Sequence, residues 1–222
     1  MQTMLKAILF DLDGTLIDSE HFYFDCWNEI LTEWGPPLSF DDWLNNYAGT
    51  TIHTNAKKLI EKYSITEPLD ELVARREKLT VERFKTMDVN LMPYALETLQ
   101  FFAEKGLPMV IATSSLRQDV EAIFNRNGLG HFFKFIITRN EVTNSKPHPE
   151  SYNLCVERLG ISKDECIVFE DTVTGLTAAK SAGLVCYVIQ SNTAEHTKLQ
   201  AADKIFLDLN KAVDYLIATK QV

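Results

Sequence analysis

Two aspartates follow a short apolar run near the beginning of the chain. The run ends at Phe10, and Asp11, Leu12, Asp13 and Gly14 come directly after it. Charged groups are costly to bury, so these carboxylates lie either in an exposed Asp-Gly turn or in a site that binds something. Residues two apart in an extended chain point to the same side, where two carboxylates repel each other. A divalent cation relieves this repulsion, and a set of oxygen ligands favours Mg²⁺.

Hydroxyl groups follow the second strand of the predicted core. The stretch VIATSS, residues 110–115, ends in Thr113, Ser114 and Ser115. Their hydroxyl and backbone N–H groups stand where a helix begins, which suits the oxygens of a phosphate. The same residue types also serve as plain helix N-caps, and this motif alone leaves both roles open.

A lysine and two more carboxylates follow later strands. The stretch SKPHPE, residues 145–150, carries Lys146 on a loop that two prolines stiffen before a helix. Lys146 either fixes a phosphate and neutralises a carboxylate, or is a solvated surface lysine. The stretch VFEDTVTG, residues 168–175, brings Glu170 and Asp171 to the same edge, where they suit a metal. The other possibility is that Asp171 or Thr172 only caps the helix that begins at Val173.

The common position of these four motifs favours a binding site over separate helix caps. Each follows a predicted strand, and the carboxyl ends of parallel strands meet at one edge of a sheet, where ligands bind. Carboxylates, hydroxyls and one ammonium group at a single edge are expected for a site that holds a metal and a phosphate. Four unrelated helix caps would not gather opposite charges in this way.

The strands are predicted from apolar runs separated by helix-like stretches. The runs are Leu5–Phe10, Met109–Ala112, Phe135–Ile137, Ile167–Phe169, Val185–Ile189 and Lys204–Phe206. The helices are predicted at Tyr94–Lys105, Gln118–Asn127, Pro149–Leu159 and Val173–Ala182, with Gly106, Gly128, Gly160 and Gly183 as stop signals. The alternation predicts an α/β fold, a Rossmann-like doubly wound parallel sheet with helices on both faces.

A helical segment interrupts this pattern after the first strand. Trp27, Ile30, Leu31 and Trp34 have the spacing of one helix face, and Pro36 breaks that helix. Further helices are predicted at Asp41–Tyr47, Thr54–Tyr63 and Leu69–Lys85. We therefore expect a small all-helical cap domain at residues 18–89, inserted into an α/β core of residues 1–17 and 90–222.

The composition indicates a globular protein with an acidic balance. The 222 residues are 45% hydrophobic, and the formal net charge is -9. We expect no nucleic-acid partner, because phosphate backbones are bound by basic faces. We expect no membrane partner, since no apolar run approaches the roughly 20 residues of a membrane span and the N-terminus lacks a secretory pattern. The four cysteines have no C-x-x-C spacing, so a cytoplasmic location is expected.

Taken in order, DLDGT, ATSS, SKPHPE and FEDTVTGLTAAKSAG resemble the four motifs of the haloacid dehalogenase-like hydrolase superfamily. The resemblance covers nearly the whole chain. It is nearest to the β-phosphoglucomutase-like, sugar-phosphatase branch, in which a helical cap follows the first motif.

The resemblance implies catalytic and metal-binding roles. Asp11 matches the nucleophile that becomes an aspartyl-phosphate, and Asp13 matches the acid that protonates the leaving alcohol and then activates water. The implied cofactor is Mg²⁺. Its implied ligands are Asp11, the backbone carbonyl of Asp13, and Asp171, with Glu170 close by.

The resemblance also implies a phosphate site. Thr113, the N–H of Ser114 and the ammonium group of Lys146 match the groups that bind the oxygens of the transferring phosphoryl group. Phosphoryl transfer depends mostly on such positioning and charge stabilisation. The expected partner is a small phosphorylated metabolite, and the chain itself is expected to be a monomer or a weak dimer.

The implied activity is that of a Mg²⁺-dependent phosphatase acting on a small phosphomonoester, a sugar phosphate. One alternative is a phosphosugar mutase, and another is a non-catalytic interaction protein on the same scaffold. The cap favours the phosphatase. When the chains are aligned on Gly49, Ala48 and Ile52 stand where the mutases carry a lysine and an arginine, although Lys57 and Lys58 follow nearby. Tyr23 stands where the mutases carry a histidine, although His21 is only two residues away.

Overall fold

A computed structural model describes residues 4–48, 50–87 and 89–222. The chain divides into two compact units. The α/β unit holds Met1–Asp18 and Asn90–Val222, and the helical unit holds Ser19–Val89. Gly49, on which the comparison with the mutases was aligned, lies outside the described residues.

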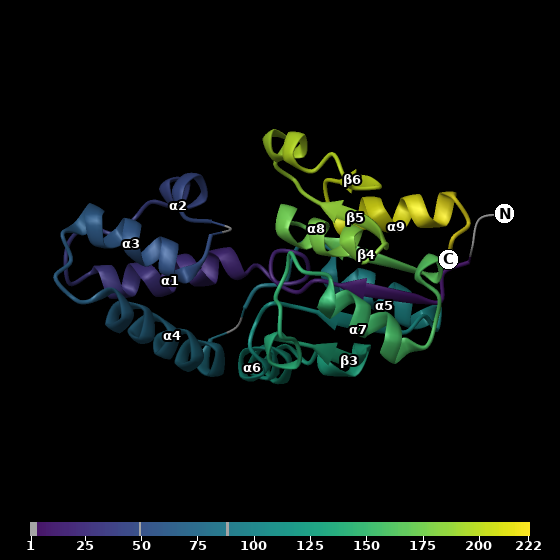
Figure 1. The fold of residues 1–222 in the computed structure, drawn as a ribbon, viewed down its shortest axis with the longest axis horizontal. Helices are drawn as coiled ribbons and strands as arrows, with labels where there is room; N and C mark the ends of the chain where they lie inside the picture. Colours follow the sequence, from purple (N-terminus) through teal and green to yellow (C-terminus); the bar gives the residue numbers. More distant parts are fainter. Residues whose placement is uncertain (1–3, 49, 88) are drawn as a thin grey trace. The chain divides into compact units, whose positions relative to one another are not determined.

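The α/β unit is built on a six-stranded parallel sheet (Figure 1). Its strand order is β3-β2-β1-β4-β5-β6. The strands are β1 (Ala7–Phe10), β2 (Met109–Ala112), β3 (Phe133–Ile137), β4 (Cys166–Glu170), β5 (Val185–Ile189) and β6 (Lys204–Phe206). The chain winds outward from β1 to β3 and then returns to continue from β4 to β6, so the winding reverses between β1 and β4. Doubly wound sheets bind their ligands at this switch point.

Helices cover both faces of the sheet (Figure 1). On one face, α5 (Ala95–Glu104) and α9 (Leu209–Ala218) pack through aromatic rings, with Phe102 against Phe10 and Tyr215 against Tyr187. On the other face, α7 (Glu150–Leu159) and α8 (Val173–Ser181) share an apolar cluster with alternate residues of β1, β2, β4 and β5. Because successive strand residues point to opposite faces, Leu9 of β1 packs beneath α7 and α8, and its neighbour Phe10 packs against α5.

The remaining elements of the α/β unit are short or lie at its edge. Helix α6 (Arg117–Asn127) packs Phe124 against Phe133 of β3. Residues 4–18 and 90–222 also include four 3-10 segments: η1 (Gly130–Phe132), η2 (Arg139–Glu141), η3 (Lys163–Glu165) and η4 (Thr193–Lys198).

Within residues 19–48, 50–87 and 89, the helical unit has four helices (Figure 1), and aromatic side chains are prominent in its core. The helices are α1 (Ser19–Leu31), α2 (Phe40–Asn46), α3 (Ile52–Tyr63) and α4 (Leu69–Thr86). Trp27 and Trp43 are almost completely buried in this core. Ser39 caps the N-terminus of α2 through the N–H of Asp42, a contact that satisfies one of the otherwise unpaired helix N–H groups.

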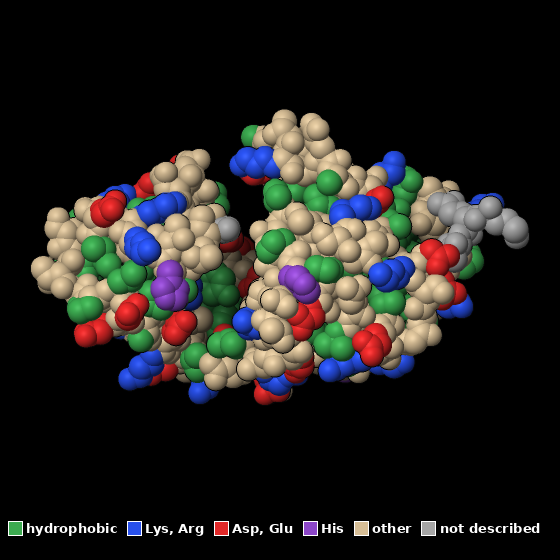
Figure 2. Space-filling view, in the orientation of Figure 1, with side chains coloured by type: hydrophobic (Ala, Val, Ile, Leu, Met, Phe, Trp, Pro, Cys, Tyr) green, Lys and Arg blue, Asp and Glu red, His purple; other side chains and the backbone are tan. Residues whose placement is uncertain are grey.

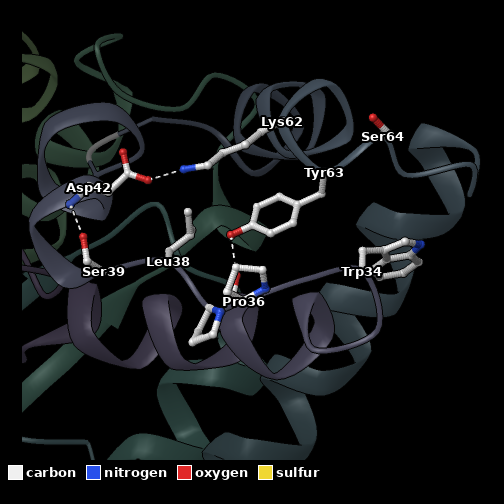
Figure 3. A pocket seen from close by; sticks show the side chains of 9 residues that line it. Trp34, Pro36, Leu38, Ser39, Asp42, Lys62, Tyr63 and Ser64 are labelled. Atoms are coloured by element: carbon white, nitrogen blue, oxygen red, sulfur yellow. Dashed lines mark hydrogen bonds and ion pairs between the residues drawn. The ribbon is translucent and has the colours of Figure 1, made fainter.

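A pocket of about 520 Å³ lies within the helical unit (Figure 3). Among the residues that line it, Lys62 and Asp42 form an ion pair at 2.5 Å, and the hydroxyl of Tyr63 donates to the carbonyl of Pro36 at 2.9 Å. None of the residues predicted to carry chemistry lines this pocket.

The doubly wound parallel sheet predicted from the sequence is confirmed. Three of the six strands have the predicted bounds; β1 and β3 differ by two residues at the start, and β4 is one residue longer at each end. The glycines predicted as stop signals all adopt the left-handed backbone expected after a helix. One expectation was wrong: α1 ends at Leu31, and Trp34 lies beyond it in a turn where the N–H of Trp34 donates to the carbonyl of Leu31. Helix α9 was not anticipated.

Within residues 4–48, 50–87 and 89–222, no helix combines the length and the apolar character that crossing a bilayer requires.

Candidate active site

Strand alternation places two carboxylates side by side at the switch point. Leu9 of β1 and Val168 of β4 pack in the cluster beneath α7 and α8. Two residues further along, Asp11 and Glu170 point to the same face of the sheet. The N–H of Asp11 donates to the carbonyl of Phe169 at 2.9 Å, so the backbones are still paired where the carboxylates emerge.

Lys146 joins these two carboxylates. Its Nζ lies 2.5 Å from Asp11 Oδ1 and 2.6 Å from Glu170 Oε1, and only 6% of its side chain is exposed. Lys146 lies on the loop before α7, and its side chain reaches the ends of β1 and β4. The solvated lysine considered from the sequence is therefore not what the structure shows.

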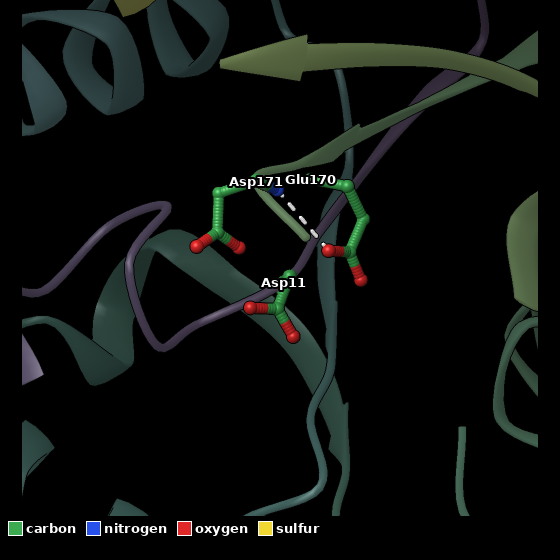
Figure 4. Close-up of side chains that lie close together, drawn as sticks. All are labelled: Asp11, Glu170 and Asp171. Carbon is green, nitrogen blue, oxygen red and sulfur yellow. Dashed lines mark hydrogen bonds between the residues drawn. The ribbon is translucent and has the colours of Figure 1, made fainter. Parts of the chain in front are cut away.

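Asp171 adds a third carboxylate to the same place (Figure 4). Asp11, Glu170 and Asp171 each offer an oxygen, and these three oxygens lie within 4.8 Å of one another. The hydroxyl of Thr15 donates to Asp171 Oδ1 at 3.3 Å. Gly14 leaves room for this carboxylate, because a Cβ at Gly14 would lie 2.1 Å from Asp171 Oδ2.

The donor set fits Mg²⁺. When ionised, the three carboxylates carry three negative charges, and Lys146 supplies one positive charge against them. Carboxylate oxygens are the ligands that Mg²⁺ prefers, so a bound divalent cation would balance the remaining charge.

Asp13 is held by the loop after β2. The hydroxyl of Ser115 donates to Asp13 Oδ2 at 2.6 Å, and that of Thr113 lies 3.4 Å from the same oxygen. The N–H of Ser115 in turn donates to Thr113 Oγ1 at 3.0 Å. Ser114 is exposed. The N-cap of α6 is Leu116, so the hydroxyls of this loop do not cap that helix.

Two contacts at the site, that of Ser115 with Asp13 and that of Tyr152 with Glu170, were not predicted from the sequence. Ser115 was named there only as one hydroxyl of its motif, and Tyr152 only as part of a helix. Tyr152 is completely buried, and its hydroxyl donates to Glu170 Oε1 at 2.7 Å. Both lie within six residues of a predicted site residue, which was the available signal. Thr172, one of the two capping candidates before α8, does cap that helix through the N–H of Gly175.

The buried charges shift one another's pKa. Burial raises the pKa of Asp11 from an ordinary 3.8 to about 8; Lys146 opposes this rise, and Glu170 and Asp13 add to it. Burial, together with Asp11 and Glu170, likewise raises the pKa of Asp171. For Lys146, burial disfavours the charge, but Asp11 and Glu170 outweigh it and raise the pKa. The lysine therefore keeps its charge, and a further cation nearby would favour the ionised forms of Asp11 and Asp171.

Comparison with known proteins agrees with this arrangement. The family model described as "Haloacid dehalogenase-like hydrolase" matches residues 8–189, which include every motif of the site. The chain belongs to the haloacid dehalogenase-like hydrolase family.

Two curated relatives of this hydrolase are phosphatases. It is 29% identical over 180 residues to the phosphorylated carbohydrates phosphatase of Thermotoga maritima, covering 81% of this chain and 82% of that protein. It is 30% identical over 185 residues to the fructose-1-phosphate phosphatase YqaB of Escherichia coli, covering 83% of this chain and 96% of that one.

A solved structure shares the fold of this hydrolase. The match is the "putative beta-phosphoglucomutase from Thermotoga maritima", with a TM-score of 0.76 and 27% identity over 91% of this chain and 94% of that one.

The raised pKa of Asp11 predicts how the stability of the metal-free protein depends on pH. Folded Asp11 keeps its proton up to about pH 8, whereas the unfolded chain releases it near 3.8. Between these values the folded state binds more protons, so the free energy of unfolding falls as the pH rises. Asp11→Asn removes this titration, and its unfolding free energy should fall less between pH 5 and pH 8.

Urea unfolding in the presence of a chelator measures both slopes. Glu157→Gln, which changes an exposed carboxylate of α7, is the control and should behave as the wild type. Added Mg²⁺ should stabilise the wild type most at the higher pH, because metal binding requires ionised ligands. Equal slopes for the wild type and Asp11→Asn would show that Asp11 is not the titrating group.

Proposed function

We propose that the chain hydrolyses small phosphomonoesters, with sugar phosphates as its substrate class, and that Asp11 is the nucleophile. The observation that carries the proposal is the pairing of Asp11 with the buried ammonium group of Lys146, 2.5 Å away, at the switch point of the sheet. The carbohydrate and fructose-1-phosphate phosphatases among its relatives support the substrate class.

The reaction takes place in two displacements at phosphorus. A carboxylate oxygen of Asp11 attacks, an O–P bond forms, and the bond from phosphorus to the alcohol oxygen breaks. Asp13 gives its proton to the departing alkoxide. In the second step Asp13 takes a proton from water, the water oxygen attacks phosphorus, and Asp11 leaves as a carboxylate with inorganic phosphate as the product.

Several groups of the chain hold the charge that develops. Lys146 faces Asp11 and offsets the charge brought in by the phosphoryl oxygens, for which fixed donors in a dry site are effective. Thr113 and the N–H of Ser114 are the proposed donors to the remaining oxygens. Ser115 orients Asp13 through its 2.6 Å hydrogen bond.

Mg²⁺ is the proposed cofactor. Asp11, the backbone carbonyl of Asp13, and Asp171 would hold it, with Glu170 beside them. When bound, the cation would neutralise charge on the phosphoryl group and on the carboxylates.

Residues 18–89 are the proposed cap, inserted between the two core segments 1–17 and 90–222. In this proposal the segment supplies the contacts that select the substrate.

Replacement of the nucleophile tests the proposal. Asp11→Asn removes the attacking charge but little volume, so it should abolish hydrolysis of p-nitrophenyl phosphate, with a loss of about 10⁴-fold or more, while the protein stays folded. The measurement is product release with Mg²⁺ and with chelator, and wild-type activity should disappear with the chelator. Glu157→Gln is the control and should match the wild type. Near-normal turnover by Asp11→Asn would refute the aspartyl-phosphate mechanism, and an inactive wild type would refute the phosphatase itself.

A second experiment separates the phosphatase from a mutase, the activity after which the structural relative from Thermotoga maritima is named. Ala48 and Ile52 stand at the cap positions where the mutases carry cations, and charged contacts of that kind are each worth about 1.5–3 kcal/mol. Without them, a bisphosphate intermediate is not retained, and water takes the phosphoryl group. The enzyme is incubated with β-glucose 1-phosphate, a trace of glucose 1,6-bisphosphate and Mg²⁺. We expect free phosphate to form faster than glucose 6-phosphate, and the opposite order would favour the mutase.

A further inference from the structure

Glu170 is a buried carboxylate whose two oxygens are both engaged. Oε1 accepts from Lys146 Nζ at 2.6 Å and from the hydroxyl of Tyr152 at 2.7 Å. Oε2 accepts from the N–H of Asp171 at 3.1 Å and lies 3.3 Å from the hydroxyl of Thr172. The lysine that faces the nucleophile and the tyrosine of α7 therefore share one acceptor atom.

Tyr152 contacts Lys146 in a second way. The ammonium nitrogen lies 4.9 Å from the centroid of the tyrosine ring, within the range of a cation–π interaction. Both side chains come from one stretch of chain, the loop that carries Lys146 and the first turn of α7. The ammonium group is thus held by Asp11, by Glu170 and by the ring.

The opposite side of Glu170 is closed by α8. A Cβ at Gly175 would lie 1.7 Å from Glu170 Oε1, so the backbone of α8 comes up against the carboxylate. The backbone of α8 therefore limits the position of Oε1 on one side, and the hydroxyl of Tyr152 on α7 binds it on the other. A tyrosine that only filled the core would need some partner for its hydroxyl, but nothing would require that partner to be the oxygen that also binds Lys146.

We propose that Tyr152 is a positioning residue for the reaction: its hydroxyl fixes Glu170 so that Glu170 aims Lys146 at Asp11. The proposal rests on the phosphatase function proposed above. Tyr152 itself touches neither Asp11 nor the substrate in this account. Its effect should therefore appear in the chemical step and not in the binding of the ground state.

The test compares two buried tyrosines of the α/β unit. Tyr152→Phe keeps the ring and removes the hydroxyl. Tyr187→Phe is the matched control, because Tyr187 is also buried and packs against Phe206 and Tyr215 on the other face of the sheet. The full chain is assayed with p-nitrophenyl phosphate and Mg²⁺, and thermal unfolding is followed by circular dichroism.

We expect Tyr152→Phe to lower kcat roughly ten- to hundredfold, the range of a hydrogen bond to a charged group, with KM within about twofold of the wild type. Tyr187→Phe should keep the wild-type kcat, and both variants should unfold as single cooperative transitions. A kcat for Tyr152→Phe no lower than that of Tyr187→Phe overturns the proposal. An inactive wild type would instead contradict the proposed function.

A binding measurement separates positioning from a general loosening of the core. Orthovanadate mimics the phosphoryl group in the transition state of its transfer. Its affinity for the protein is measured by calorimetry in the presence of Mg²⁺, a measurement that does not require an active variant. Tyr152→Phe should weaken this affinity in the wild-type background and should cause no further loss in Lys146→Ala, because the tyrosine acts through the lysine. Equal losses in both backgrounds would overturn the proposal.

Discussion

The structure depends on the burial of two carboxylates side by side, Asp11 and Glu170, at the ends of neighbouring strands. Ionised carboxylates in a water-poor site repel each other and lose their hydration. One ammonium group offsets part of this repulsion: the Nζ of Lys146 lies 2.5 Å from Asp11 and 2.6 Å from Glu170. One cation does not balance these two carboxylates and Asp171. The site is thus suited to a divalent metal.

The fold supplies this arrangement through simple geometry. The two-residue period of a strand sends Asp11 and Glu170 to the face covered by α7 and α8, and the topology makes β1 and β4 neighbours. Gly14 and Gly175 then let the backbone come close to Asp171 and Glu170, where a Cβ would overlap a carboxylate oxygen. The charged centre therefore stands at the ends of two strands that are buried along their whole length.

Much of this arrangement could be predicted because it depends on sequence order and strand ends. Asp11, Lys146, Glu170 and Asp171 all follow or end apolar runs, and a parallel sheet gathers such positions at one edge. The contact of Tyr152 with Glu170 could not be predicted, since it depends on how α7 lies over the sheet.

Other features escaped prediction for local reasons. The backbone of the loop after β2 turns Ser115 and not Ser114 toward Asp13. Helix α9 follows the last strand, and its N-cap, Asp208, which accepts from the N–H of Lys211 at 2.8 Å, was a usable signal.

The central claim is that Asp11 carries the phosphoryl group between the two steps, and trapping that acyl phosphate tests it most directly. The enzyme is mixed with substrate and Mg²⁺, quenched, treated with borohydride, which reduces an acyl phosphate to an alcohol, and mapped by peptide mass spectrometry. The account predicts homoserine at position 11, dependent on substrate and absent in Asp11→Asn. An active enzyme whose residue 11 remains aspartate while another side chain carries the phosphoryl group would contradict it.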